Sequence, residues 1–246
     1  MDQPRDSPPP PPPPPLGRLR IGTAGWATAH WAGPFYPPGA SRANGEALLS
    51  HFQESFDTVE ANGVHYGTPT ADVVRAWRSR CGTGFEFCWK AHKGITHQGR
   101  LDREEALSTL SAMLERASLL GVHLGVLLVQ CPRTLQADVT MLEAFAAAID
   151  AAGDAAPRRV ALEFRHASWH DDEAVLAFLR ARDWALVLHP NSVGRATTGN
   201  QAAGRDGSSA KYALEPLRTD LVTASFVYVR LQCVARTLPH PLYRWP

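Results

Sequence analysis

The chain has 246 residues, of which 44% are hydrophobic and 20% are charged, and its formal net charge is +1. This composition is typical of a globular protein with a large buried core. The near-zero net charge excludes the strongly basic overall surface of many nucleic-acid and membrane-surface binders, while leaving room for a local basic patch.

The chain begins with a proline-rich tail. Residues Pro8–Pro15 are an unbroken proline run, which forms a stiff polyproline II segment without a core. We predict a disordered tail over residues 1–18, with the functional alternative that the run is a ligand for an SH3 or WW domain. The N-terminus lacks the apolar segment of a secretory signal, and no apolar run is long enough to cross a membrane. We therefore expect a soluble cytoplasmic protein.

Strand-like and helix-like segments alternate from residue 19 onward. Apolar patterns predict seven strands, at 19–26, 57–66, 85–93, 124–132, 160–169, 184–190 and 225–232. Helices are predicted between them at 47–56, 70–80, 104–120, 137–150 and 172–183, and a long flexible insertion at 191–211. This alternation indicates a parallel sheet, either doubly wound or closed into a (β/α)₈ barrel. The sequence contains neither a complete Gly-x-Gly-x-x-Gly fingerprint nor a P-loop.

The cysteines predict neither a disulfide framework nor a zinc site. None of the four forms a C-x-x-C pair, and three of them lie in or at the end of apolar runs. We expect structural thiols in a reducing compartment for Cys81, Cys88, Cys131 and Cys233.

Most of the predicted strands are apolar at first and polar at their C-terminal ends. Side chains alternate between the two faces of a strand, so Glu163 and Arg165 share one face of the fifth strand and Leu162 and Phe164 lie on the other. The C-terminal ends of parallel strands converge on one rim, and we predict a functional cleft there. The alternative is a polar plug in which the charges pair with one another and close one end of a barrel.

The residue types at this rim are suited to a small phosphorylated or carboxylated substrate. Arginine and lysine bind oxyanions, a glutamate is a candidate general base, and His97 is a candidate general acid or base. The reactions most compatible with this set are hydrolysis and isomerisation. The predicted catalytic residues are Glu60, Lys90, His97 and Glu163. The predicted substrate-binding residues are Trp26, Asn62, Tyr66, Thr96, Gln130, Arg165, Trp169, Tyr228 and Arg230, with the three large aromatic side chains as walls of the cleft.

Two alternative functions stay open. A divalent metal could be bound by Glu60, His97 and Glu163, but Lys90 and Arg165 would compete for the carboxylates, and no His-x-His or His-Glu-x-x-His pair is present. We therefore assign no metal ligands. Nucleic-acid binding, as in metal-dependent endonuclease barrels, is an analogy of architecture, and the neutral net charge argues against it.

The order of seven sequence blocks resembles the YecE-like family, domain of unknown function 72. The blocks are IGTAGW, HWAGPFYP, VEANGVHY, FEFCWKAHKGITH, VLLVQCP, ALEFRHASW and FVYVR. The resemblance implies a single TIM-type α/β barrel domain of parallel strands over residues 19–246. Family members usually follow the Tyr-x-Arg sequence with a His–Gly pair, a further helix and an eighth strand, whereas Leu231 and Gln232 follow here and 233–246 is an atypical tail. We therefore expect about seven of eight strands and a weakly stable or partner-dependent chain, with a catalytically inactive truncated isoform as the other interpretation.

Overall fold

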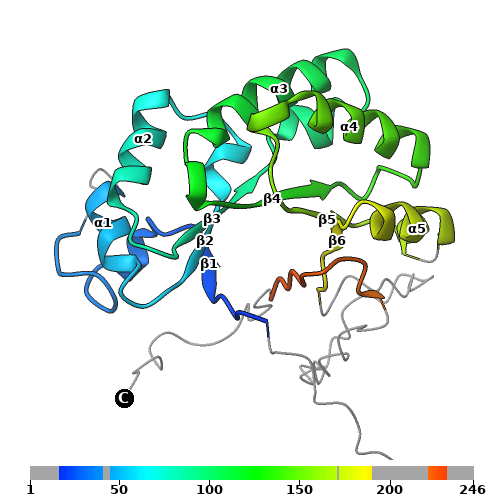
Figure 1. The fold of residues 1–246 in the computed structure, drawn as a ribbon. Helices are drawn as coiled ribbons and strands as arrows, with labels where there is room; N and C mark the ends of the chain where they lie inside the picture. Colours follow the sequence, from blue (N-terminus) through cyan, green and yellow to red (C-terminus); the bar gives the residue numbers. More distant parts are fainter. Residues whose placement is uncertain (1–16, 41–44, 171, 190–220, 232–246) are drawn as a thin grey trace, which may run out of the picture.

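The fold is known from a computed structural model, which describes residues 17–40, 45–170, 172–189 and 221–231 (Figure 1). The proline run, the 191–211 insertion and the 233–246 tail lie outside the described residues, so the predictions for them stay predictions. No helix in the described ranges has both the length and the apolar character needed to cross a membrane.

Six parallel strands form one sheet in which every strand lies beside its predecessor in the chain. The strands are β1 (Gly22–Ala24), β2 (Thr58–Ala61), β3 (Glu86–Lys90), β4 (Leu124–Cys131), β5 (Val160–Phe164) and β6 (Ala185–Leu186). They are shorter than predicted because polar residues at their ends enter turns; after β2, for example, the chain forms a short 3₁₀ helix at Asn62–His65. The expected α/β alternation with a parallel sheet is confirmed.

In the described ranges, five α-helices cover one face of the sheet. They are α1 (Gly45–Phe52), α2 (Ala71–Arg80), α3 (Glu104–Ser118), α4 (Val139–Ala151) and α5 (Glu173–Ala181). Helices α2 to α5 begin and end within two residues of their predicted positions, because side-chain caps and amphipathic spacing are local signals. The side chain of Thr70 accepts a hydrogen bond from the Val73 N–H at the start of α2, and Asp172 accepts two at the start of α5.

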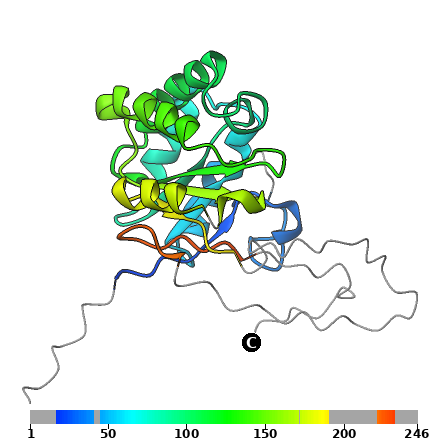
Figure 2. The same ribbon diagram turned by 90° about the vertical axis from the view of Figure 1, so that its right-hand side faces the viewer.

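The two faces of the sheet carry different side chains. The helix-facing side holds the large apolar core, including Val59, Phe87, Leu127, Leu162 and Phe164. The inner face holds a smaller apolar cluster, formed by Cys88, Val126, Leu128, Ala161, Ala185 and Val187. Residues 221–231 run along this inner face, opposite the helices in both views (Figures 1 and 2).

Residues 221–231 make one isolated bridge rather than the predicted seventh strand. The Leu188 N–H donates to the Tyr228 carbonyl at 2.9 Å, and the Arg230 N–H donates to the Leu188 carbonyl at 3.0 Å. Earlier in the same segment, the Thr223 hydroxyl accepts a hydrogen bond from the Leu186 N–H at 2.8 Å and donates one to the Trp184 carbonyl at 2.7 Å. The Thr223 side chain thus satisfies backbone groups of Trp184 and Leu186, at and just before β6, that a seventh strand would pair. Within the described residues the sheet therefore has six strands.

Candidate functional site

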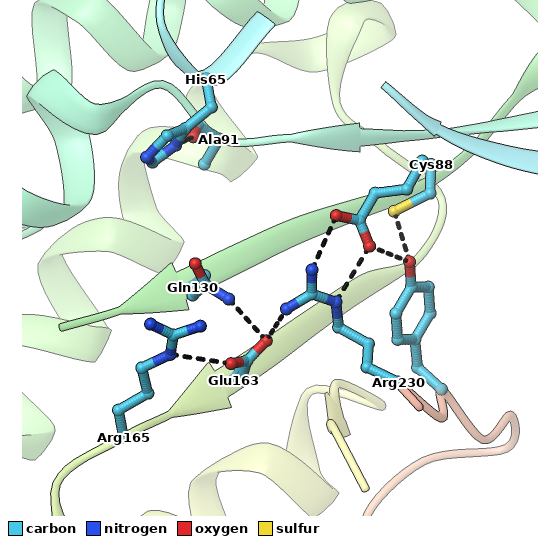
Figure 3. Close-up of polar contacts among 9 residues, drawn as sticks. His65, Cys88, Ala91, Gln130, Glu163, Arg165 and Arg230 are labelled. Carbon is cyan, nitrogen blue, oxygen red and sulfur yellow. Dashed lines mark hydrogen bonds and ion pairs between the residues drawn. The ribbon is translucent and has the colours of Figure 1, made fainter. Parts of the chain in front are cut away.

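Buried polar side chains from four neighbouring strands meet at the carboxyl end of the inner face. Lys90 ends β3, and Glu60, Gln130 and Glu163 each lie one residue before the end of β2, β4 and β5, respectively. All four are less than 9% exposed. Together with Arg165, Tyr228 and Arg230 they form what we call the rim cluster, and Figure 3 shows the contacts among its members other than Lys90. Period-two alternation places them here, because their neighbours in the chain face the helices.

Arg230 lies at the centre of the rim cluster and joins two strands. Its Nε donates to Glu60 Oε2 at 3.0 Å and its Nη2 donates to Glu60 Oε1 at 2.9 Å, which is a two-pronged ion pair. Its Nη1 donates to Glu163 Oε2 (Figure 3). Burial alone would lower the pKa of Arg230, but the two carboxylates raise it above its ordinary value. The guanidinium therefore stays charged and holds both glutamates.

Glu163 is surrounded by hydrogen-bond donors. Besides Arg230, the Gln130 amide donates to Oε2 at 2.8 Å and the Arg165 Nε donates to Oε1 at 3.0 Å. Burial by itself would raise the pKa of Glu163, but the charge of Arg230 and these hydrogen bonds hold it below its ordinary value. Glu163 is therefore ionised at neutral pH, and both of its oxygens are engaged.

This arrangement predicts an acid-sensitive contribution to stability. The pKa of Glu163 is lower in the folded chain than its ordinary 4.5, so the unfolded chain takes up the proton first as the pH falls. The stabilisation is therefore complete above about pH 5 and is lost as the pH falls through the folded pKa. In denaturant titrations between about pH 3 and pH 7, the free energy of unfolding of Glu163→Gln is expected to depend less on pH than that of the unmodified chain.

The matched control is Glu143→Gln, at an exposed position on α4. It is expected to leave the acid dependence of the unfolding free energy unchanged. The same slope in Glu163→Gln and in Glu143→Gln would contradict the ionised, hydrogen-bonded state of Glu163.

Lys90 differs from the other cations of the rim cluster. The residue is 8% exposed, yet within the described ranges its ammonium makes no hydrogen bond and no ion pair. Arg230 and Arg165 hold the nearby carboxylates instead. The pKa of Lys90 lies below its ordinary value, mainly because of burial; Arg230 and Arg165 add to this lowering, and Glu60 and Glu163 oppose it. An unpaired buried cation is costly, and it is typical of a site that binds a partner.

Two histidines lie within the electrostatic influence of Lys90. The rings of His65 and His97 are 5.3 Å apart, and the Thr96 hydroxyl is 2.7 Å from His97 Nδ1. His65 Nδ1 is 2.6 Å from the Ala91 carbonyl, which can only accept, so Nδ1 carries the proton and Nε2 carries the lone pair. Burial lowers the pKa of both histidines, and the charge of Lys90 lowers it further. Both rings are therefore neutral near pH 7.

The sequence comparison now places the chain among known proteins. The profile of a family described as "Protein of unknown function DUF72" matches residues 20–244. The chain belongs to this family. No curated protein matches the sequence significantly.

Solved structures of DUF72 family proteins share the fold. The chain matches one from Thermotoga maritima with a TM-score of 0.59 and 22% identity, covering 86% of this chain and 73% of that one. It matches another, from Enterococcus faecalis, with a TM-score of 0.55 and 21% identity, covering 69% of this chain and 60% of that one. At such identities the likeness shows the fold alone.

The structure corrects the prediction that Trp26 and Trp169 line the cleft of this DUF72 chain. Gly25, at φ 92°, turns the chain after β1, and Trp26 packs against Trp77 and Phe87 on the helix-facing side. Trp169 is fully buried in the same core, stacked on Phe164 at 4.1 Å. By contrast, the predicted wall residue Tyr66 is 71% exposed and lies beside His65, with their ring centres 5.0 Å apart.

The candidate metal ligands do not form a metal site. In the described part of the chain no group of three or more His, Cys, Asp and Glu side chains is arranged to hold an ion. Glu60 and Glu163, two of the three ligands considered, are both paired with Arg230. The donor set at the rim of this DUF72 protein therefore does not fit a divalent metal.

Sequence reasoning missed two residues of the site, His65 and Cys88. His65 lies on the short 3₁₀ helix after β2, where alternation between strand faces no longer applies. Cys88 lies 3.0 Å from the Tyr228 hydroxyl, which also donates to Glu60 Oε2 at 3.2 Å. Burial raises the pKa of this thiol, in agreement with a structural role. Asn62, which the sequence predicts to bind substrate, has a buried Oδ1 without a hydrogen-bond partner among the described residues.

Proposed function

We propose that this DUF72 protein binds a small anionic molecule at the carboxyl rim of a TIM-type (β/α) barrel. Six parallel strands in chain order, with helices on one face and residues 221–231 on the other, support the barrel. In such barrels the site lies at the carboxyl end of the strands, where the rim cluster is found.

The charge balance of the rim cluster supports an anion. Three cations, Lys90, Arg165 and Arg230, face two carboxylates, Glu60 and Glu163, and both carboxylates are already paired. One positive charge is therefore uncompensated while the nearby histidines are neutral. The observation that carries the proposal is that Lys90, a residue only 8% exposed, has an ammonium without a partner within the described residues. A phosphate or carboxylate would supply that partner.

Arg165 is the second anion-binding group. Its side chain is 39% exposed, and only its Nε is used, in the bond to Glu163. The paired Nη groups make no hydrogen bond within the described chain, and a two-pronged contact with an oxyanion suits them. Glu163 thus positions Arg165, and Glu60 positions Arg230, rather than acting as general bases.

The neutral histidines give the site acid–base chemistry. His65 Nε2 carries a lone pair, and His97 lies beside it. Groups of this kind move protons at neutral pH, so the reactions we propose are hydrolysis or isomerisation of the bound anion.

Thermal unfolding in the presence of phosphate or sulfate tests the anion site. A ligand at one hundred times its dissociation constant stabilises the folded chain by about 2.7 kcal/mol, so the melting temperature should rise. Lys90→Met and Arg165→Met are expected to remove this rise, while Lys93→Met, three residues away and outside the rim cluster, keeps it. Sodium chloride at the same ionic strength controls for screening. An equal rise in the unmodified chain and in Lys90→Met would overturn the proposal.

A further inference from the structure

We propose that Lys90 is an amine nucleophile that forms an imine with the carbonyl group of a small anionic aldehyde or ketone. The inference deepens the proposed function and rests on it, because the anion-binding group is Arg165. It assigns different tasks to Lys90 and Arg165.

The choice of lysine at position 90 is the first reason. The chain contains 22 arginines and three lysines, Lys90, Lys93 and Lys211. The other two cations of the rim cluster are arginines. A guanidinium is the better oxyanion ligand, but it does not lose its proton in proteins and cannot act as a nucleophile. A lysine amine can lose its proton and can act as a nucleophile. Anion binding alone therefore does not explain why position 90 is a lysine.

The contacts of Arg230 are the second reason. A lysine among carboxylates is ordinarily held as an ammonium by an ion pair. Here Arg230 uses its Nε and both Nη groups on Glu60 and Glu163, and Arg165 and Gln130 occupy the remaining positions on Glu163. Lys90 is left buried without an ion pair in the described part of the chain. Burial also lowers its pKa, which increases the fraction present as neutral amine.

The proton balance of the step needs no additional reagent. The Lys90 nitrogen forms a bond to the carbonyl carbon, and the π electron pair moves to the oxygen. One proton leaves the nitrogen and one is taken up by that oxygen, giving a carbinolamine. Loss of the remaining nitrogen proton and departure of the hydroxyl as water give the imine. The lone pair of His65 Nε2 can accept these protons and return them, since the ring is neutral and near Lys90.

The position of Arg165 limits the substrate class. Arg165 is held at the rim by Glu163, with its Nε 3.0 Å from Glu163 Oε1, and Glu163 and Lys90 both lie at the carboxyl ends of their strands, so we assign the two cations to one binding site. The carboxylate of a 2-oxo acid on the Arg165 Nη groups places the carbonyl group one carbon away, toward the lysine. We therefore infer short 2-oxo acids as the substrate class and choose pyruvate and glyoxylate as probes.

Reductive trapping tests the inference on the full chain. The protein is incubated with pyruvate or glyoxylate, the imine is reduced with borohydride, and modified peptides are identified by mass spectrometry. We expect the dominant adduct on Lys90, with Lys93, Lys211 and the α-amino group as internal controls. Lys90→Arg keeps the positive charge, so it should lose the adduct while phosphate still raises its melting temperature. Arg165→Met should reduce trapping at Lys90 at low probe concentration.

The outcomes separate this inference from the proposed anion site. If phosphate and pyruvate stabilise the chain but Lys90 is modified no more than Lys93, the anion site stands and the imine chemistry is wrong. If neither anion stabilises the chain and no Lys90 adduct forms, both are wrong. A Lys90 adduct without stabilisation by any anion, and unaffected by Arg165→Met, supports the nucleophile and overturns the role of Arg165.

Discussion

Replacing Arg230 with methionine is expected to lower the free energy of unfolding by about 3 kcal/mol or more. The substitution leaves Glu60 and Glu163, which are 7% and 3% exposed, without the cation that pairs with both. It also removes a link between the 221–231 segment and strands β2 and β5. This link matters because, in the described part of the chain, the backbone of the segment pairs with the sheet region only at the bridge between Leu188 and Val229. Denaturant unfolding of both chains at neutral pH measures the difference.

The matched control is Arg75→Met, which removes an exposed ion pair with Asp72 on α2. Exposed pairs contribute little, so a change within about 0.5 kcal/mol is expected. Adding Glu60→Gln and Glu163→Gln to Arg230→Met should recover most of the lost stability, because the cost comes from uncompensated charges. If Arg230→Met costs no more than Arg75→Met, the rim cluster is not held together by Arg230.

Much of the rim cluster follows from period-two alternation. Glu60, Lys90 and Glu163 each lie at or next to the last residue of a strand and face away from the helices, and sequence alone places them on one rim because all strands are parallel. The same alternation holds in 221–231, where Phe226 and Tyr228 pack inward and Val227 and Val229 are exposed, although only one residue pair forms a bridge. Face alternation is thus a more robust prediction than strand membership.

The choice of partners within the cluster does not follow from the sequence. The sequence predicts that Lys90 and Arg165 compete for the carboxylates, but Arg230, which is 170 positions from Glu60, holds both Glu60 and Glu163. That choice depends on the path of residues 221–231 along the inner face, which is a long-range feature. It leaves Lys90 unpaired within the described chain, and this is the observation on which the proposed chemistry depends.

The same limit explains the two misplaced tryptophans. Strand periodicity ends at the last strand residue, so it cannot assign a face to a side chain in the turn that follows. Trp26 follows Gly25 at φ 92°, and Trp169 ends a short 3₁₀ helix at Ala167–Trp169. Both turns direct the indole toward the helices. Aromatic residues near a rim are therefore weaker indicators of a binding wall than charged residues within the strands.

Trp169→Ala is accordingly expected to lower the free energy of unfolding by about 4 kcal/mol, the effect of a large cavity in a core. The indole is fully buried and stacked on Phe164, and its Nε1 donates to the Leu135 carbonyl at 2.7 Å. Trp169→Phe keeps the stacking and loses the hydrogen bond, so it should cost clearly less. Denaturant unfolding of the three chains checks this order.

Anion binding distinguishes a core residue from a wall of the cleft. If Trp169 belongs to the core, Trp169→Phe should bind phosphate as the unmodified chain does, because the indole lies on the opposite side of the sheet from Lys90. Tyr66→Ala is the comparison at an exposed aromatic position beside His65, where loss of a wall would weaken binding without a large cost in stability. Weakened phosphate binding in a stably folded Trp169→Phe chain would return that residue to the cleft and overturn its assignment to the core.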